Sequence, residues 1–179
     1  MNKTFWGLAL IIIVFGFVAC KDKPKPQTEE VVIPPTTEQK ATNSNNNIIL
    51  RDTDRNETTL GEELAKNKLT IVDFWASWCG PCRQEMPNVV SLYNEFSSKG
   101  LGIIGISLDE DNASWQKAIK ELDMSWQQFS DLRGWEDGAA QHFGIRAIPH
   151  TIVFDENGEI IAQGLRGNLL RAFIAEKLE

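Results

Sequence analysis

The chain has 179 residues, of which 42% are hydrophobic and 24% are charged, and its formal net charge is −7. A chain of this length can bury one core of ordinary size, so we expect a single globular domain with appendages. The acidic balance argues against a nucleic-acid partner, because phosphate binding needs a basic face. Three cysteines are too few for a disulfide framework, and two of them form one C-x-x-C pair.

Residues 1–20 have the pattern of an export signal. They open with Lys3 and then run apolar from Phe5 to Ala19. A run of about 15 residues is short for a bilayer, which needs about 20, and is typical of a signal-peptide core. Cys20 follows in a sequence that resembles a lipoprotein signal, so we expect it to be lipidated. An uncleaved membrane anchor, ordinary cleavage and no export are the alternatives. A lipidated Cys20 and an uncleaved anchor would both place the domain outside the cytoplasm, at a membrane surface.

Residues 21–47 have the composition of a linker. They combine Lys-Pro repeats, Pro34-Pro35 and a run of Thr, Asn and Ser with few large apolar residues and no periodicity. Such a segment cannot bury enough apolar surface to fold, so a disordered linker is predicted. The globular domain is then expected to span residues 48–179. It should open with a hairpin formed by Ile48–Leu50 and Glu57–Leu60, followed by a helical turn within 61–68.

The chemistry of the chain is concentrated in Leu69–Pro87. An apolar, β-rich run predicts a buried strand, and the apolar residues that follow repeat at helical spacing, so Cys79 and Cys82 straddle the start of a helix. Unsatisfied N–H groups and the helix dipole favour a thiolate there. The two cysteines lie one turn apart, which is close enough for a disulfide. Pro81 suits the first turn, where no amide hydrogen is needed.

The rest of the chain alternates between helix and strand patterns. Four helices are predicted: one after the cysteines that ends near Gly100, one that includes Trp115–Leu122 and is capped by residues 109–112, one over 135–143, and one that begins at Gly167. The last is expected to bury Leu169, Leu170, Phe173, Ile174 and Leu178. Predicted strands cover 101–108, 126–129, 151–154 and 159–163, the last two joined by an Asn157-Gly158 turn. This order indicates an α/β fold whose mixed sheet is covered by helices on both faces.

The string WCGPC after V-D-F-W resembles the active site of thioredoxins. The R-Q-E-M-P that follows is similar to the membrane-tethered, TlpA/ResA-like thiol-disulfide oxidoreductases. This resemblance extends from Ile48 to the C-terminus. It implies a thioredoxin-like fold with an N-terminal hairpin extension and a helix-strand insertion formed by the Trp115 helix and the strand at 126–129. It also implies that the redox group is the cysteine pair itself, with no bound cofactor.

The resemblance and the position of the cysteines assign roles within the pair. Cys79, nearer the helix start, is expected to be the nucleophile, and Cys82 the thiol that resolves the mixed disulfide. Trp78, Gly80 and Pro81 are expected to contact the substrate. A zinc site and a passive disulfide are the alternatives. Zinc needs about four ligands, and no second C-x-x-C or H-x-x-H is present, so no metal is expected.

A second segment, Ile148-Pro149, precedes a predicted strand. In the family that the chain resembles, the matching proline is cis and lies opposite the cysteines, and the backbone of the residue before it pairs with the substrate. Ile148 and Pro149 are therefore expected to bind substrate, with an ordinary strand-starting proline as the alternative. His150, next to them, could tune the thiolate or make a structural hydrogen bond.

Two carboxyl groups are candidates for acid-base chemistry. Asp73 matches the buried aspartate of thioredoxins, and between apolar neighbours its pKa would be raised by desolvation, so it could exchange a proton with Cys82. Glu85, six residues after Cys79, matches the acidic residue of the ResA-like group. Either could be the working group. The alternatives are a solvated strand-edge position for Asp73 and a surface position for Glu85.

We therefore expect an extracytoplasmic thiol-disulfide oxidoreductase that reduces protein disulfides. Gly80-Pro81 resembles the dipeptide of thioredoxin, a strong reductant at about −270 mV. The resemblance implies protein substrates, apocytochromes c among them. A reductant would also need an electron donor at the membrane, for which we expect a membrane thiol carrier, and we expect a monomer. A thiol peroxidase is one alternative, although such enzymes usually carry Thr or Ser where Ala76 stands. A lipid-anchored binding or assembly module without turnover is the other.

Overall fold

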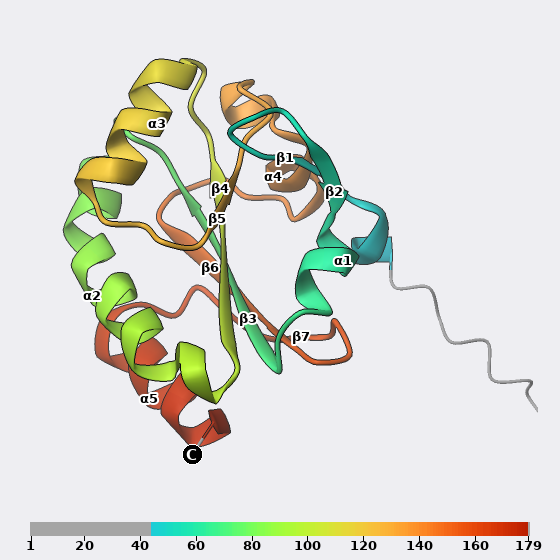
Figure 1. The fold of residues 1–179 in the computed structure, drawn as a ribbon, viewed down its shortest axis with the longest axis vertical. Helices are drawn as coiled ribbons and strands as arrows, with labels where there is room; N and C mark the ends of the chain where they lie inside the picture. Colours follow the sequence, from blue (N-terminus) through green and yellow to red (C-terminus); the bar gives the residue numbers. More distant parts are fainter. Residues whose placement is uncertain (1–43, 179) are drawn as a thin grey trace, which may run out of the picture. The chain divides into compact units, whose positions relative to one another are not determined.

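The computed structural model describes residues 44–178. The predicted signal segment with Cys20, and residues 21–43 of the predicted linker, lie outside the described residues. The described chain opens with a short 3₁₀ helix, η1 (Ser44–Asn47), and continues into a five-stranded mixed sheet with a separate two-stranded hairpin. This is the predicted thioredoxin-like α/β arrangement (Figure 1).

The strands of the main sheet run in the order β5-β4-β3-β6-β7. They are β3 (Leu69–Trp75), β4 (Leu101–Ser107), β5 (Gln127–Phe129), β6 (His150–Asp155) and β7 (Ile160–Gln163). The pairs β3/β4 and β4/β5 are parallel, whereas β3/β6 and β6/β7 are antiparallel. Every residue of β3 and β4 is buried, as their continuous apolar runs predict for central strands.

Helices cover both faces of this sheet. The crossovers β3-α2-β4 and β4-α3-β5 step in the same direction, and right-handed crossovers therefore place α2 (Gly80–Phe96) and α3 (Asn112–Glu121) on one side. Helix α5 (Gly167–Leu178) lies on that side as well, while α1 (Leu60–Leu64), α4 (Gly138–His142) and the hairpin lie on the other (Figure 1).

The N-terminal hairpin pairs β1 (Ile49–Arg51) with β2 (Glu57–Thr59), as predicted. Thr59 and Glu62 form a capping box that starts α1 directly after the hairpin. Arg51 donates to Asp131 at 2.8 Å, which joins the hairpin to the loop that follows β5.

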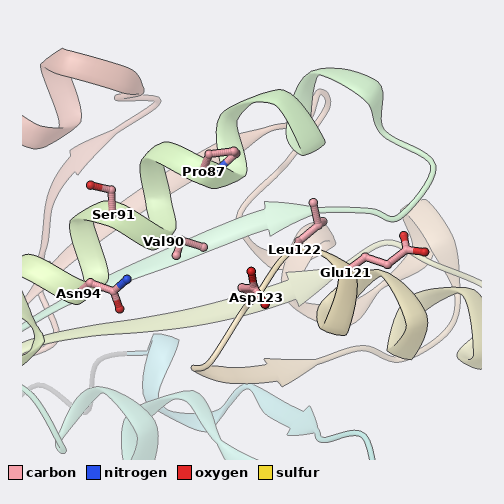
Figure 2. Close-up of a pocket in the computed structure, with 7 residues that line it drawn as sticks. All are labelled: Pro87, Val90, Ser91, Asn94, Glu121, Leu122 and Asp123. Atoms are coloured by element: carbon pink, nitrogen blue, oxygen red, sulfur yellow. The ribbon is translucent and has the colours of Figure 1, made fainter.

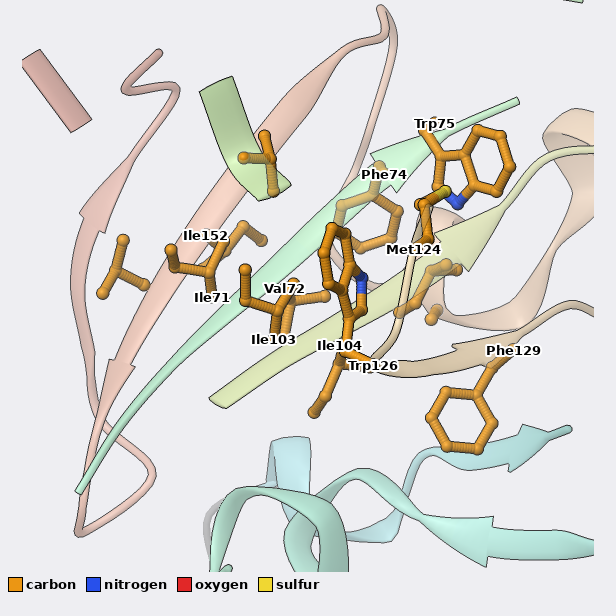
Figure 3. Packing of buried hydrophobic residues seen from close by; sticks show 14 of the residues in the cluster. Ile71, Val72, Phe74, Trp75, Ile103, Ile104, Met124, Trp126, Phe129 and Ile152 are labelled. Atoms are coloured by element: carbon orange, nitrogen blue, oxygen red, sulfur yellow. The ribbon is translucent and has the colours of Figure 1, made fainter. Parts of the chain in front are cut away.

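The core is one continuous cluster of buried side chains around β3 and β4 (Figure 3). Side chains of a strand alternate between faces, and Phe74 packs on Phe143 beside α4, with ring centroids 6.1 Å apart. Residues 71, 73 and 75 therefore point to the opposite face, toward α2. This alternation places Asp73 beneath the start of α2.

Two details of the predicted helices are wrong. The helix predicted over 135–143 is broken into η3 (Gly134–Glu136) and α4, because the Asp137 carboxylate accepts from the N–H groups of residues 139 and 140 and starts a new helix. Leu169, predicted to face the core, is 71% exposed. Leu170 and Ile174 define the buried stripe of α5, and one residue corresponds to about 100° of rotation.

Candidate active site

The cysteine pair closes a disulfide at the start of α2. Cys79 is the N-cap residue, and its sulfur lies 2.04 Å from that of Cys82. The Cys82 N–H also lies 3.2 Å from Cys79 Sγ and donates to it, so a backbone donor at the helix start points at this sulfur. Gly80 and Pro81 occupy the exposed first turn of the helix. The predicted placement of both cysteines at a strand-to-helix junction is confirmed.

A tight turn, residues 76–79, delivers Cys79 from β3 to α2, and we call it the active-site turn. It is closed by the Cys79 N–H, which donates to the Ala76 carbonyl at 3.1 Å. Trp78 within it is 56% exposed, whereas Cys79 is 5% and Cys82 only 1% exposed. Cys79 is thus the more accessible sulfur, beside a large apolar surface.

The Ile148–Pro149 peptide bond is cis, as the resemblance implies. Strand β6 begins directly after it, and His150 is the register partner of Phe74 near the end of β3. Since β3 and β6 are antiparallel, the start of β6 lies at the same end of the sheet as the active-site turn. The fold therefore places the second predicted segment at the same end of the sheet as the cysteine pair.

Asp73 lies in the middle of the sheet, paired with Gly105 on β4 and Thr151 on β6, and is only 3% exposed. Desolvation, and to a lesser degree the charge of Glu85, raise its pKa to about 7. The alternative of a solvated strand-edge residue is wrong. Asp73 is a buried carboxyl group that can change its protonation near neutral pH.

Glu85 is half-buried on α2 and faces the start of α5. Its carboxylate accepts from the Gly167 N–H at 2.7 Å and from the Asn88 side chain at 3.3 Å. It acts electrostatically on Asp73, so the structure brings the two predicted carboxyl groups into one neighbourhood. Glu85 is not the plain surface residue of the alternative reading.

A scan against protein families matches residues 33–171 to the model described as Redoxin. The chain belongs to the redoxin family. This redoxin is 28% identical to the thiol-disulfide oxidoreductase ResA of Bacillus thuringiensis over 114 residues, 64% of each chain. It is 29% identical to the thiol:disulfide interchange protein HelX of Rhodobacter capsulatus, over 65% of this chain and 62% of HelX. The matches thus span less than two thirds of the length of these relatives.

A solved structure supports the same placement. The thioredoxin domain of a thiol-disulfide oxidoreductase from Bacteroides vulgatus is 32% identical to this redoxin, with a TM-score of 0.67, covering 74% of this chain and 93% of that one. The predicted thioredoxin-like TlpA/ResA family and the predicted thioredoxin-like fold are confirmed, whereas the membrane tether stays a prediction.

His150 is half-buried beside the cis peptide bond of the redoxin. Burial lowers its pKa, and the positive charge of Arg166 lowers it further. Both causes favour the neutral ring over the charged one.

Sequence reasoning missed a polar cluster beside the active-site turn. Asp109, predicted as part of a helix cap, is instead buried, and Asp111 alone caps α3 through the Ser114 N–H. The Asp109 carboxylate accepts hydrogen bonds from Ser77 and Ser107. An aspartate just after an apolar strand that ends in a serine was the available signal.

Away from the disulfide, the redoxin has a surface groove of about 440 Å³ between α2 and the end of α3 (Figure 2). Its lining includes none of the predicted site residues: Pro87, Val90, Ser91, Asn94, Glu121, Leu122 and Asp123. Within residues 44–178, no three His, Cys, Asp or Glu side chains lie close enough together to hold a metal ion. None of the helices described here is both long and apolar enough to cross a bilayer.

Proposed function

We propose that this redoxin is a thiol-disulfide oxidoreductase that reduces disulfides of other proteins. The observation that carries the proposal is the Cys79–Cys82 pair at the N-terminus of α2, at the same end of the sheet as the Ile148–Pro149 segment. Helix N-termini favour thiolates, and cysteines one helical turn apart are close enough to form a disulfide. The names of the ResA and HelX relatives support the same reaction class.

In the proposed reaction, the reduced protein attacks with the Cys79 thiolate. A new sulfur–sulfur bond forms between Cys79 and one substrate sulfur, and the other substrate sulfur leaves and takes up a proton. The Cys82 thiol then loses its proton and attacks Cys79. This step closes the Cys79–Cys82 disulfide and releases the second substrate thiol. The substrate gains two electrons and two protons, and the enzyme pair is oxidised.

Asp73 is the proposed acceptor of the Cys82 proton. It lies on the face of β3 that points toward α2, and its pKa of about 7 lets it take up and release a proton at neutral pH. Glu85 is proposed to modulate this group through its charge. Its carboxylate is engaged with the Gly167 N–H, which supports a secondary role.

The substrate is proposed to bind across the active-site turn and the cis-proline segment. Trp78, Gly80 and Pro81 form the exposed surface next to Cys79. The Ile148 backbone, before Pro149, would pair with an extended segment of the substrate. A polypeptide disulfide fits an open surface of this kind.

Location and partners complete the proposal. We place the domain outside the cytoplasm, held at a membrane through Cys20 or an N-terminal anchor, where a membrane thiol carrier would reduce the pair again. Protein disulfides, including those of apocytochromes c, are the proposed substrates, and the protein is proposed to act as a monomer. A peroxidase is disfavoured by Ala76. A non-catalytic binding module would keep its cysteines oxidised.

Insulin reduction tests the proposal. The protein, reduced with dithiothreitol, is mixed with insulin, and precipitation of the insulin B chain is followed beside Cys79→Ser and Cys82→Ser variants. Rapid reduction that the Cys79→Ser variant loses supports the oxidoreductase, and the Cys82→Ser variant should trap the mixed disulfide. Peroxide consumption without insulin reduction would favour the peroxidase. Inactivity in both assays would favour the binding module.

A further inference from the structure

Asp109 is a buried carboxylate that the proposed reaction does not use. It lies after Leu108, beyond the end of β4, and is 1% exposed. One oxygen accepts from the Ser77 N–H at 2.9 Å and from the Ser107 hydroxyl at 2.6 Å, and the other accepts from the Ser77 hydroxyl at 2.5 Å. Three donors thus converge on one buried group.

Two of these three donors belong to the active-site turn. Ser77 is its second residue, and the turn is closed by the hydrogen bond from Cys79 to Ala76. By holding both the backbone and the side chain of Ser77, Asp109 fixes the orientation of the segment that leads to Cys79. Trp78 adds little to this, because a side chain that is 56% exposed has few packing contacts to hold it.

Asp109 is itself held firmly from the sheet. Its N–H donates to the Ser107 hydroxyl at 3.0 Å, and the next residue toward the strand, Leu108, donates to the Trp75 carbonyl at 2.8 Å. The Ser130 hydroxyl donates to the Ser107 carbonyl at 2.8 Å. The ends of β3, β4 and β5 therefore support the carboxylate as one rigid unit.

We propose that Asp109 is a positioning residue, whose carboxylate holds the active-site turn so that Cys79 and Trp78 meet a substrate disulfide in the orientation that exchange requires. The proposal rests on the proposed function for its chemical consequence. Attack on a disulfide needs the incoming sulfur aligned with the bond it breaks. A misplacement of about 1 Å can cost about a hundredfold in rate.

We call the hydrogen bonds between Asp109 and residues 77 and 107 the brace. The pattern of donors predicts which substitution preserves it. In Asp109→Asn, the amide oxygen can accept from the Ser77 N–H and the Ser107 hydroxyl, while the amide N–H donates to the Ser77 hydroxyl. In Asp109→Ala, no acceptor remains. The two variants therefore distinguish the effect of the hydrogen bonds from that of the charge, because the asparagine keeps the hydrogen bonds and removes the charge.

The test compares exchange rates of folded protein at a temperature where circular dichroism shows every variant to be native. We expect Asp109→Ala to reduce insulin about 10- to 100-fold more slowly than the wild type, and Asp109→Asn to stay within about threefold. Alkylation of Cys79 by iodoacetamide, a small reagent that approaches freely, should change less than about threefold in both variants.

Asp137→Ala is the matched control. Asp137 is also a buried carboxylate, 3% exposed, and it accepts from three backbone N–H groups, those of residues 131, 139 and 140. Its removal deletes the same number of hydrogen bonds beside α4. We expect the insulin rate of folded Asp137→Ala to stay within about twofold of the wild type. An equal loss in Asp137→Ala and Asp109→Ala would overturn the proposal.

Amide hydrogen exchange at Ser77 tests the brace independently of activity. The Ser77 amide should be protected in the wild type and in Asp109→Asn, and lose protection in Asp109→Ala. If the wild type reduces no insulin, the proposed function fails and this measurement alone decides the brace. If Asp109→Ala does not fold, Ser77→Ala, which removes one of the three bonds, should slow insulin reduction several-fold. The positioning role is refuted if amide hydrogen exchange at Ser77 is unchanged in every variant, or if Asp109→Asn reduces insulin as slowly as Asp109→Ala.

Discussion

Asp73 lies on β3, and Asp109 lies just beyond the end of the neighbouring strand β4; both are almost fully buried, at 3% and 1% exposure. Their surroundings differ. Asp109 receives three hydrogen bonds from Ser77 and Ser107. The pKa of Asp73 is set by desolvation and by the charge of Glu85, and no donor among residues 44–178 offsets either cause.

The difference between these two regions shows that the surroundings of a buried carboxyl group decide its role. A buried carboxylate surrounded by donors is locked in place and serves as a brace. A buried carboxyl group without donors prefers its proton, so it destabilises the fold when ionised and remains available for proton transfer. Substitutions at the two positions should therefore change stability in opposite directions.

The largest expected effect is a gain of stability in Asp73→Asn. A pKa raised from 3.8 to about 7 means that the folded state holds the proton more tightly. The stability that the protonated Asp73 contributes is fully present below pH 4 and is lost as the pH rises through 7. At pH 8 the ionised group therefore costs on the order of 4 kcal/mol, which the asparagine avoids. Urea unfolding of the oxidised protein at pH 4 and pH 8 measures this, and an equal difference at both pH values would contradict it.

The second effect has the opposite sign. Asp109→Ala leaves the donors of Ser77 and Ser107 without an acceptor, and we expect a loss of about 2 to 4 kcal/mol at pH 8. Asp109→Asn should lose less than about 1 kcal/mol, because it can accept and donate in place. The same urea titrations measure both variants. An Asp109→Ala variant as stable as the wild type would remove the contrast with Asp73.

The third effect concerns Gly105, the β4 neighbour of Asp73 in the register. A Cβ at this position would lie 2.1 Å from the Gln128 side-chain oxygen, which accepts from the Trp75 indole at 3.0 Å. Gly105→Ala should therefore cost about 1 to 3 kcal/mol by overpacking. At Gly80, nothing lies within 4 Å of an added Cβ, so Gly80→Ala is the stability control and should not be destabilised. Equal thermal midpoints for the two variants would refute the packing argument.

The smallest effect is that of Glu85→Gln. The variant keeps an acceptor for the Gly167 N–H but removes the charge that contributes to the raised pKa of Asp73. The pKa of Asp73 should fall, and stability at pH 8 should rise by about 1 kcal/mol or less. An NMR titration of the Asp73 carboxyl carbon measures the first change. A rise in this pKa would show that Glu85 acts through something other than its charge.

The sequence by itself determined the features that depend on neighbours along the chain. Helical spacing placed Cys79 and Cys82 one turn apart at the start of α2, and the strand before them followed from its apolar run. The hairpin β1-β2 and the turn at Asn157-Gly158 followed from local patterns as well. These elements are fixed by hydrogen bonds and dihedral preferences within a few residues.

Only the tertiary structure decided the rest. The burial of Asp109 against Ser77, 32 residues away, and the contact between Glu85 and Gly167, 82 residues away, arise from strands and helices that meet in space. The break at Asp137 and the exposure of Leu169 depend on which face each short helix presents to the sheet. Periodicity gives a helix its apolar stripe, but the position of the core decides which edge of the stripe is covered.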